Sequence, residues 1–299
     1  MISSRARPCL LVVSLLAWTG CRSAELPAPA PAHVLPFERN EHDNILVRAV
    51  LNGEDEVLLM LHTAVDSLSM TTDSLARAKS VELDSEAKIT SWGGSRATRN
   101  SSSNALRIGE LEWDGLAITE DTHSGPGSDG KFGCNLFADW ILEIDWEREQ
   151  LVLHDTLPSA AKAYDHIDLD VRGSNLFVPA TVVTGAGSYE NHYLLHSGFG
   201  GALLFDDAFA QEHGLADELP LLGERELRDS LGNVLTTKKV QVPTLRVGSC
   251  ELEDVPAEFF SGAIGRQKMS VFGCNLLTRF SVFLDVRRGR LYLRPLHAS

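Results

Sequence analysis

Two histidines stand at the ends of short apolar runs in this sequence. The stretch VLLMLHT carries His62, and the stretch HYLLHS carries His196. Each run has the length of a strand and delivers an imidazole, followed by a hydroxyl residue, into a turn. An imidazole can transfer protons near neutral pH or bind a transition metal through a ring nitrogen. These two histidines are therefore the first candidates for chemistry.

The segments around both histidines belong to an internal repeat. ALRIGELEWDGLAI (105–118) matches TLRVGSCELEDVPA (244–257), and KFGCNLFADWILEIDWEREQLVL (131–153) matches VFGCNLLTRFSVFLDVRRGRLYL (271–293). Both copies consist of short strand patterns separated by turn residues. The sequence therefore predicts an all-β fold of two similar lobes, with the histidine loops facing each other in a cleft on the pseudo-twofold axis.

In their order, these motifs resemble those of the aspartic peptidase superfamily, the pepsin-like and retropepsin-like proteins, and most of all its exported bacterial type. The resemblance covers about residues 45–295. In that family each lobe carries two apolar residues, Asp, Thr or Ser, and Gly, and later two apolar residues and a glycine that packs on the catalytic loop. The resemblance implies two β-barrel-like lobes, a monomer, and a cleft that takes a peptide or small-molecule ligand.

The family motifs map onto this sequence residue by residue. LHTA (61–64) and LHSG (195–198) occupy the first motif, and KFGCN and VFGCN occupy the second. The resemblance assigns support of the histidine loops to Thr63, Ser197, Gly198, Gly133 and Gly273, and a substrate-covering flap to Trp92 and Gly93.

Both catalytic aspartates of the family are replaced, by His62 and His196, and Ala64 stands where the family has glycine. The family reaction needs two carboxylates that share one proton. Two imidazoles are both neutral near pH 7, or repel each other when both are charged. We therefore do not expect conventional acid-protease activity.

The same replacement in both copies favours a paired role for the two histidines, as metal ligands or as an acid–base pair. Two converging imidazoles can begin a site for Zn, Cu or Fe, although a third ligand is needed. Cys134 and Cys274 are symmetric candidates, but core packing is favoured for them over ligation or a disulfide. The alternatives are a catalytically inert pseudoprotease that binds peptides or other ligands, and a residual peptidase or hydrolase.

The N-terminal residues have a pattern that is typical of an export signal. Arg5 and Arg7 precede a short apolar run (9–18), and small residues then lead to Cys21. This pattern resembles a bacterial lipoprotein signal over residues 1–21, with Cys21 as the lipidated residue; the alternative is plain secretion with cleavage nearby. We expect a protein of the bacterial cell envelope, held to the membrane only by a lipid anchor.

The remaining chain divides into three parts. A Pro/Ala-rich tether is expected over residues 22–36, an N-terminal lobe over 37–160 and a C-terminal lobe over 161–299. The formal net charge of the full chain is -14. Because an acidic chain repels phosphate backbones, nucleic-acid binding is not expected.

Overall fold

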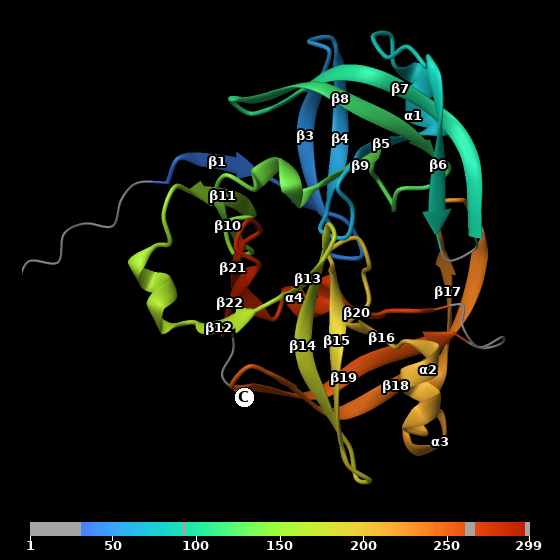
Figure 1. The fold of residues 1–299 in the computed structure, drawn as a ribbon, viewed down its shortest axis with the longest axis vertical. Helices are drawn as coiled ribbons and strands as arrows, with labels where there is room; N and C mark the ends of the chain where they lie inside the picture. The colour runs from blue at the N-terminus through green and yellow to red at the C-terminus, as the bar shows by residue number, and fades with distance from the viewer. Residues whose placement is uncertain (1–30, 92–93, 261–266, 297–299) are drawn as a thin grey trace, which may run out of the picture.

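The structure is a computed structural model that describes residues 31–91, 94–260 and 267–296. Two eight-stranded sheets form the two lobes, and a six-stranded sheet joins them (Figure 1). The predicted all-β fold with two similar lobes is confirmed. No helix in the described ranges is long and apolar enough to cross a membrane.

The N-terminal lobe has the strand order β2-β3-β4-β9-β5-β8-β7-β6. Its elements are β2 (Glu38–Arg39), β3 (Ile45–Leu51), β4 (Asp55–His62), β5 (Leu68–Thr71), α1 (Thr72–Arg77), β6 (Ser85–Ser91), β7 (Gly94–Ile108), β8 (Leu111–Asp121), β9 (Gly130–Gly133) and the 3-10 helix η1 (Cys134–Phe137). The hairpin β6–β7 is long, and its strands leave the body of the lobe toward the other lobe (Figure 1).

The C-terminal lobe repeats this order strand for strand, as β13-β14-β15-β20-β16-β19-β18-β17. Its elements are β13 (Asp170–Arg172), β14 (Asn175–Val183), β15 (Ser188–His196), β16 (Leu203–Leu204), α2 (Asp207–Glu212), α3 (Leu215–Glu218), β17 (Leu221–Arg228), β18 (Val234–Val247), β19 (Cys250–Phe260), β20 (Ser270–Gly273) and α4 (Cys274–Leu277). The repeat in the sequence is therefore a repeat of the fold.

The joining sheet has the order β1-β11-β10-β21-β22-β12 and takes strands from both halves. Its strands are β1 (His33–Pro36), β10 (Ile141–Asp145), β11 (Gln150–His154), β12 (Asp165–Asp168), β21 (Phe280–Asp285) and β22 (Arg290–Pro295). Its centre is the pairing of β10 with β21, in register at Leu142 and Leu284. The halves thus share backbone hydrogen bonds away from the cleft.

Two expected boundaries can be placed on this fold. The tether was expected to extend to residue 36, but His33–Pro36 form β1 and pair with β11, so these residues belong to the folded part. The sequence did not predict this strand, because its alternation of exposed and buried side chains covers only four residues next to a Pro/Ala-rich run. The expected lobe boundary after residue 160 falls inside the 3-10 helix η2 (Ser159–Ala163), between the lobes.

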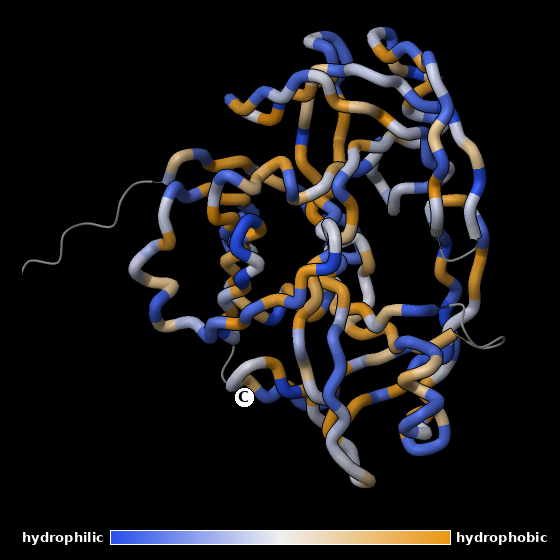
Figure 2. The backbone as a smooth tube through the Cα atoms, viewed as in Figure 1, coloured by the Kyte–Doolittle hydropathy of each residue, from blue (hydrophilic) through white to orange (hydrophobic). Residues whose placement is uncertain are grey.

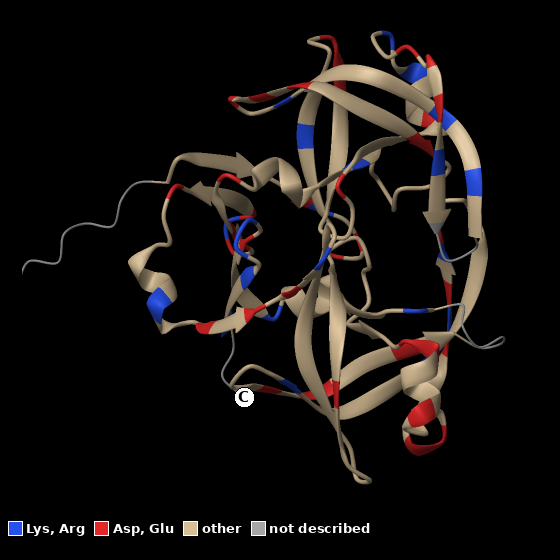
Figure 3. Ribbon diagram, viewed as in Figure 1, with Lys and Arg blue, Asp and Glu red and all other residues tan. Residues whose placement is uncertain are grey.

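Residues at both ends of helix α2 explain where it begins and ends. The Asp206 carboxylate accepts the backbone N–H groups of Ala208 and Phe209, which caps the helix N-terminus. Gly214 follows the helix in the left-handed conformation at φ +61°, where glycine carries no steric cost. Acidic residues gather on α2 and α3 (Figure 3).

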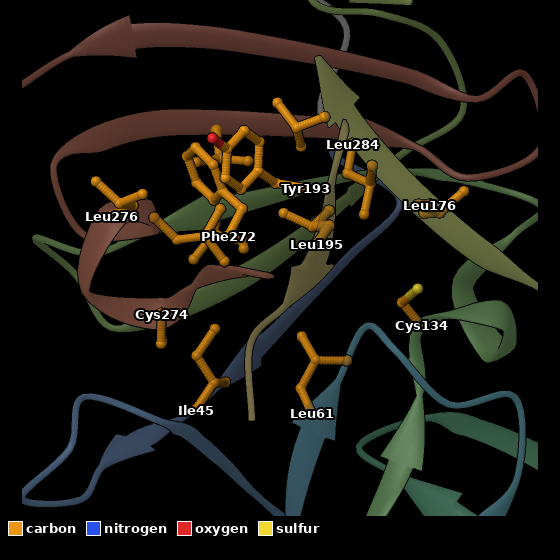
Figure 4. Packing of buried hydrophobic residues seen from close by; sticks show 14 of the residues in the cluster. Ile45, Leu61, Cys134, Leu176, Tyr193, Leu195, Phe272, Cys274, Leu276 and Leu284 are labelled. Atoms are coloured by element: carbon orange, nitrogen blue, oxygen red, sulfur yellow. The ribbon is translucent and has the colours of Figure 1, made fainter. Parts of the chain in front are cut away.

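One large apolar cluster runs through both lobes and the joining sheet. Figure 2 shows hydrophobic stretches along strands of both lobes and of the joining sheet, whereas much of α2 and α3 is hydrophilic. Leu61 and Leu195, which precede the two histidines, are fully buried in this cluster (Figure 4). Each buried leucine contributes about 1.5–3 kcal/mol. The core therefore fixes the strand ends that carry the histidines.

Candidate functional site

The two histidines occupy equivalent strand ends. β4 ends at His62 and runs parallel to β9, with His62 in register with Gly133; β15 ends at His196 and runs parallel to β20, with His196 in register with Gly273. Successive side chains in a strand point to opposite faces. Since Leu61 and Leu195 point into the core, the imidazoles point away from it.

The paired glycines lie directly under the histidine loops. A Cβ atom on Gly133 would come within 2.3 Å of the Val65 carbonyl oxygen, and one on Gly273 within 2.1 Å of the Gly201 carbonyl oxygen. Such distances are too short for any side chain. Both positions therefore require glycine because the loop backbone passes over them.

The two histidine loops are bound to each other by a reciprocal set of hydrogen bonds. The Thr63 N–H donates to Ser197 Oγ and the Ser197 N–H donates to Thr63 Oγ1, both at 3.0 Å. Each hydroxyl also crosses the interface as a donor, Thr63 Oγ1 to the Leu195 carbonyl (2.7 Å) and Ser197 Oγ to the Leu61 carbonyl (2.6 Å). The hydroxyl residue after each histidine thus fixes the opposite loop.

Asn44 adds a further bond to this arrangement, and the sequence did not single it out. Its side chain is buried and donates from Nδ2 to the Ser197 carbonyl at 2.7 Å. It therefore supports the C-terminal histidine loop from the N-terminal lobe.

The structure brings the two imidazoles into contact. The ring centroids of His62 and His196 are 4.4 Å apart, with the planes tilted by 54°. His62 is buried, and its ring lies against Gly198, where a Cβ atom would be 2.3 Å from His62 Cδ2. The Ala64 N–H donates to His62 Nδ1 at 3.3 Å, which places the proton of the neutral ring on Nε2.

Both imidazoles are held in the neutral form. Burial lowers the pKa of His62 well below its usual value, and the charges of His196 and Lys131 lower it further. Burial and the charge of Lys131 lower the pKa of His196 to about 4. A neutral, hydrogen-bonding pair therefore lines the cleft at neutral pH.

The pair lies in a cavity of about 1280 Å³ that both lobes line. Residues of the β6–β7 hairpin line one side, including Thr90 and Gly94. The expected flap residues Trp92 and Gly93 lie between these and outside the described residues, as does the expected lipidation site Cys21.

A second hairpin, β17–β18, covers the cavity from the C-terminal lobe. At its tip, the Ser230 carbonyl accepts the backbone N–H groups of Thr122 (3.0 Å) and His123 (3.3 Å) of the N-terminal lobe. The buried Asp229 carboxylate braces the tip by accepting the Leu231 and Asn233 N–H groups. Sequence reasoning missed this crossing, because hairpin length alone does not say where a tip docks.

Beside His62 lies a buried ion pair that sequence reasoning also missed. Lys131 Nζ lies 2.6 Å from Asp121 Oδ2 and donates to Ser230 Oγ at 2.8 Å. Asp121 Oδ2 also accepts the Ser69 hydroxyl at 2.6 Å. The sequence does hold one sign of this ion pair. The motif KFGCN begins with the charged Lys131, whereas the matching motif VFGCN begins with Val271.

The carboxylates that could have replaced the missing pair do other work. Asp145 and Asp285 each accept backbone N–H groups of the following turn and pair with Arg148 and Arg288. Asp66, which follows the first histidine loop, is exposed. None of these three carboxylates lines the cavity in the part of the chain that the structure describes.

The donor set fits a bound metal ion poorly. Within the described ranges, no group of three His, Cys, Asp or Glu side chains is placed to hold one. Cys134 and Cys274 form no disulfide among the described residues and are buried in the core. Burial raises the pKa of the Cys134 thiol to about 12 and that of Cys274 as well, so neither is a ready thiolate.

Two further features oppose a cation at the histidine pair. The Lys131 ammonium lies close enough to lower both histidine pKa values and would repel it. The bond from Ala64 to His62 Nδ1 also places a proton on Nε2, the nitrogen that a ligand role would need.

The two lobes and the joining sheet form a two-lobed all-β fold of the pepsin-like type. A crystal structure of an aspartic proteinase from Irpex lacteus matches this fold with a TM-score of 0.56 and 13% identity. The match covers 88% of this chain and 97% of that protein. No protein-family model matches the chain, and no curated protein matches it in sequence.

Proposed function

We propose that this protein binds a peptide or small-molecule ligand in the inter-lobe cleft without hydrolysing it, as a pseudoprotease. The histidine pair is the floor of the binding site. The observation that carries the proposal is the contact of His62 with His196, 4.4 Å between ring centroids, inside a 1280 Å³ cavity and in surroundings that keep both rings neutral.

The neutral His62 ring offers a ligand its Nε2–H as a donor, because Nδ1 already accepts the Ala64 N–H. A general base works best when its pKa lies near the operating pH. The pKa of about 4 at His196 makes that ring a weak base at neutral pH. The geometry therefore supports hydrogen bonding to a ligand better than proton transfer, which remains the alternative together with metal binding.

The first test is a peptidase assay on a quenched fluorescent peptide library from pH 3 to pH 8. We expect no cleavage by the wild type, with or without pepstatin. Cleavage that disappears in the His62→Gln/His196→Gln variant would overturn the proposal in favour of a histidine-dependent hydrolase.

The second test restores carboxylates with His62→Asp/His196→Asp. Because the reciprocal bonds of Thr63 and Ser197 already hold the two loops together, we expect acid-dependent cleavage that pepstatin inhibits. The single variants are the matched controls and should stay inactive, since one carboxylate cannot form a proton-sharing pair. A folded but inactive double variant would count against a peptide-shaped cleft.

The metal alternative is tested by titration with Zn²⁺ and Cu²⁺, comparing the wild type with His62→Ala/His196→Ala. We expect equal, weak binding by both proteins. Tight binding by the wild type alone, weakening as the pH falls through 6.5, would replace the proposal with a metal site.

Export and lipidation are part of the proposal. The signal over residues 1–21 would deliver the protein to the bacterial cell envelope, and Cys21 would hold it there. In cells, the wild type should take up radiolabelled palmitate and the Cys21→Ser variant should not. Equal labelling of both proteins would exclude Cys21 as the lipidated residue.

A further inference from the structure

We infer that the cleft selects its ligand by side: a neutral hydrogen-bonding group, a hydroxyl or a carboxamide, binds against Lys131 and Asp121, and an apolar group binds against Phe199 and Val271. This inference rests on the proposed function and adds the chemical class and the orientation of the ligand.

The internal symmetry shows which positions to compare. In the N-terminal lobe Ser69 pairs with Lys131, and in the C-terminal lobe Leu204 pairs with Val271 at the equivalent place. Asp121 ends β8 as Phe260 ends β19. The same three backbone positions are therefore Ser, Lys and Asp on one side, and Leu, Val and Phe on the other.

The polar side has hydrogen-bonding capacity to spare. An ammonium has three N–H donors, and the contacts of Lys131 with other described residues use two, to Asp121 and Ser230. Within the described residues, the contacts of the Asp121 carboxylate all fall on Oδ2. Both residues line the cavity and are almost fully buried. One donor and one acceptor thus remain for a ligand.

The apolar side forms a separate cluster of six buried residues: Phe199, Leu204, Leu227, Leu235, Phe260 and Val271. Three of them, Phe199, Leu227 and Val271, line the cavity. The Arg225 guanidinium over Phe199 is already paired with Glu258 at 2.9 Å. The three apolar side chains of this wall therefore offer contact area without hydrogen-bonding groups of their own.

The charge balance decides which polar group fits. Lys131 and Asp121 already neutralise each other, so a charged ligand group would be left uncompensated in a buried place. An apolar group would cover the remaining donor and acceptor without replacing their bonds. A hydroxyl or carboxamide can accept from Lys131 and donate to Asp121 at once.

The experiment is a selection of phage-displayed random hexapeptides on the immobilised wild-type protein. We expect enriched peptides to carry Ser, Thr, Asn or Gln next to Leu, Ile, Val or Phe. Enriched peptides with apolar residues on both sides, or with a charged residue in the polar place, would overturn the inference and leave the proposed function standing. No enrichment would overturn peptide binding in the proposed function, and the inference with it.

The role of the ion pair is tested with a synthetic peptide from this selection. The variant Lys131→Met/Asp121→Asn removes both charges together. We expect this variant to bind the peptide about tenfold more weakly than the wild type does. We also expect the variant to bind the peptide no better than an analogue with Val in place of Thr or Leu in place of Asn. Equal loss for peptide and analogue would refute direct recognition.

The matched control is Arg99→Met/Glu120→Gln, which removes a neighbouring ion pair. Glu120 precedes Asp121 on β8 and therefore points to the opposite face of the sheet. This control should bind as the wild type does. Should the Lys131/Asp121 variant fail to fold, the composition of the wild-type selection decides alone.

Discussion

The two halves of the cavity share one backbone and differ in their side chains. In the N-terminal half, Lys131 forms a buried ion pair with Asp121 and reaches the tip of the opposite hairpin. In the C-terminal half, Val271 and Phe260 occupy the equivalent positions in an apolar cluster. Between the halves, His62 and His196 are identical residues in equivalent places.

This comparison separates the positions that the fold needs from those that the proposed ligand site uses. Positions that are alike in both halves, such as Gly133 and Gly273, let the backbone of the adjoining histidine loop approach closely in each half. Positions that differ, such as Lys131 and Val271, line the cavity. The histidines are alike and also line the cavity, which sets them apart from both groups.

We expect the largest effect from Lys131→Met. The change leaves the Asp121 carboxylate buried without its cation, which costs about 3–5 kcal/mol of unfolding free energy. The double change Lys131→Met/Asp121→Asn should recover most of this loss, because no lone charge remains. Urea unfolding monitored by tryptophan fluorescence measures both. A single variant as stable as the wild type would show that the two halves do not differ in electrostatics.

Gly133→Ala and Gly273→Ala should each lower the unfolding free energy by about 3 kcal/mol, and by similar amounts. In both cases the new methyl group meets a loop carbonyl oxygen closer than 2.5 Å. Gly185→Ala is the matched control, since a Cβ atom there has no atom of the described residues within 4 Å. An unchanged melting temperature in one half alone would break the symmetry of the loop support.

The third prediction concerns pH. The folded-state pKa of each central histidine lies below its unfolded value of about 6.5, so the unfolded chain binds more protons as the pH falls. Stability should therefore be full above pH 6.5 and decline toward pH 4. For His196 alone the loss is about 3 kcal/mol at most, since its folded-state pKa is about 4.

The variant His62→Gln/His196→Gln should show a shallower decline over the same interval. The remaining histidines are common to both proteins, so the difference between the two curves isolates the pair. Parallel curves from pH 6.5 to pH 4 would mean that the pair titrates as it does in the unfolded chain.

The smallest effect is expected from exchanging the residues two places after each histidine. Gly198→Ala puts a methyl group against the His62 ring, whose free end can move, so a loss of about 1 kcal/mol is expected. Ala64→Gly should cost about 0.5–1 kcal/mol through backbone entropy alone. Histidine NMR spectra distinguish them: Gly198→Ala should shift the His62 resonances, and Ala64→Gly should leave them nearly unchanged.

The sequence predicted those features that it states twice. The two lobes and the facing loops were predicted from the apolar runs before His62 and His196 and from the two copies of Phe-Gly-Cys-Asn-Leu. Each copy of the repeat supports the interpretation of the other copy. The expected flap at Trp92 and Gly93 stays a prediction, as do the metal and acid–base roles of the histidines.

Features that occur once were not predicted. Asp121 lies on β8 and Lys131 lies on β9. The two strands come together because β5 pairs with both, parallel to β8 and antiparallel to β9. Asn44 reaches Ser197 across 153 residues of sequence, a contact that no local pattern encodes. The strand at His33–Pro36 depends wholly on its partner β11, because its composition favours an extended tether.

The reciprocal bonds between the histidine loops also bear on how the chain folds. Thr63 and Ser197 are 134 residues apart, so neither loop can close until both lobes have largely been synthesised and collapsed. Contacts of such sequence separation slow folding, because loop-closure entropy is lost before the bonds form. Until then each half of the joining sheet has an unpaired edge, at β10 or β21, that is open to other strands.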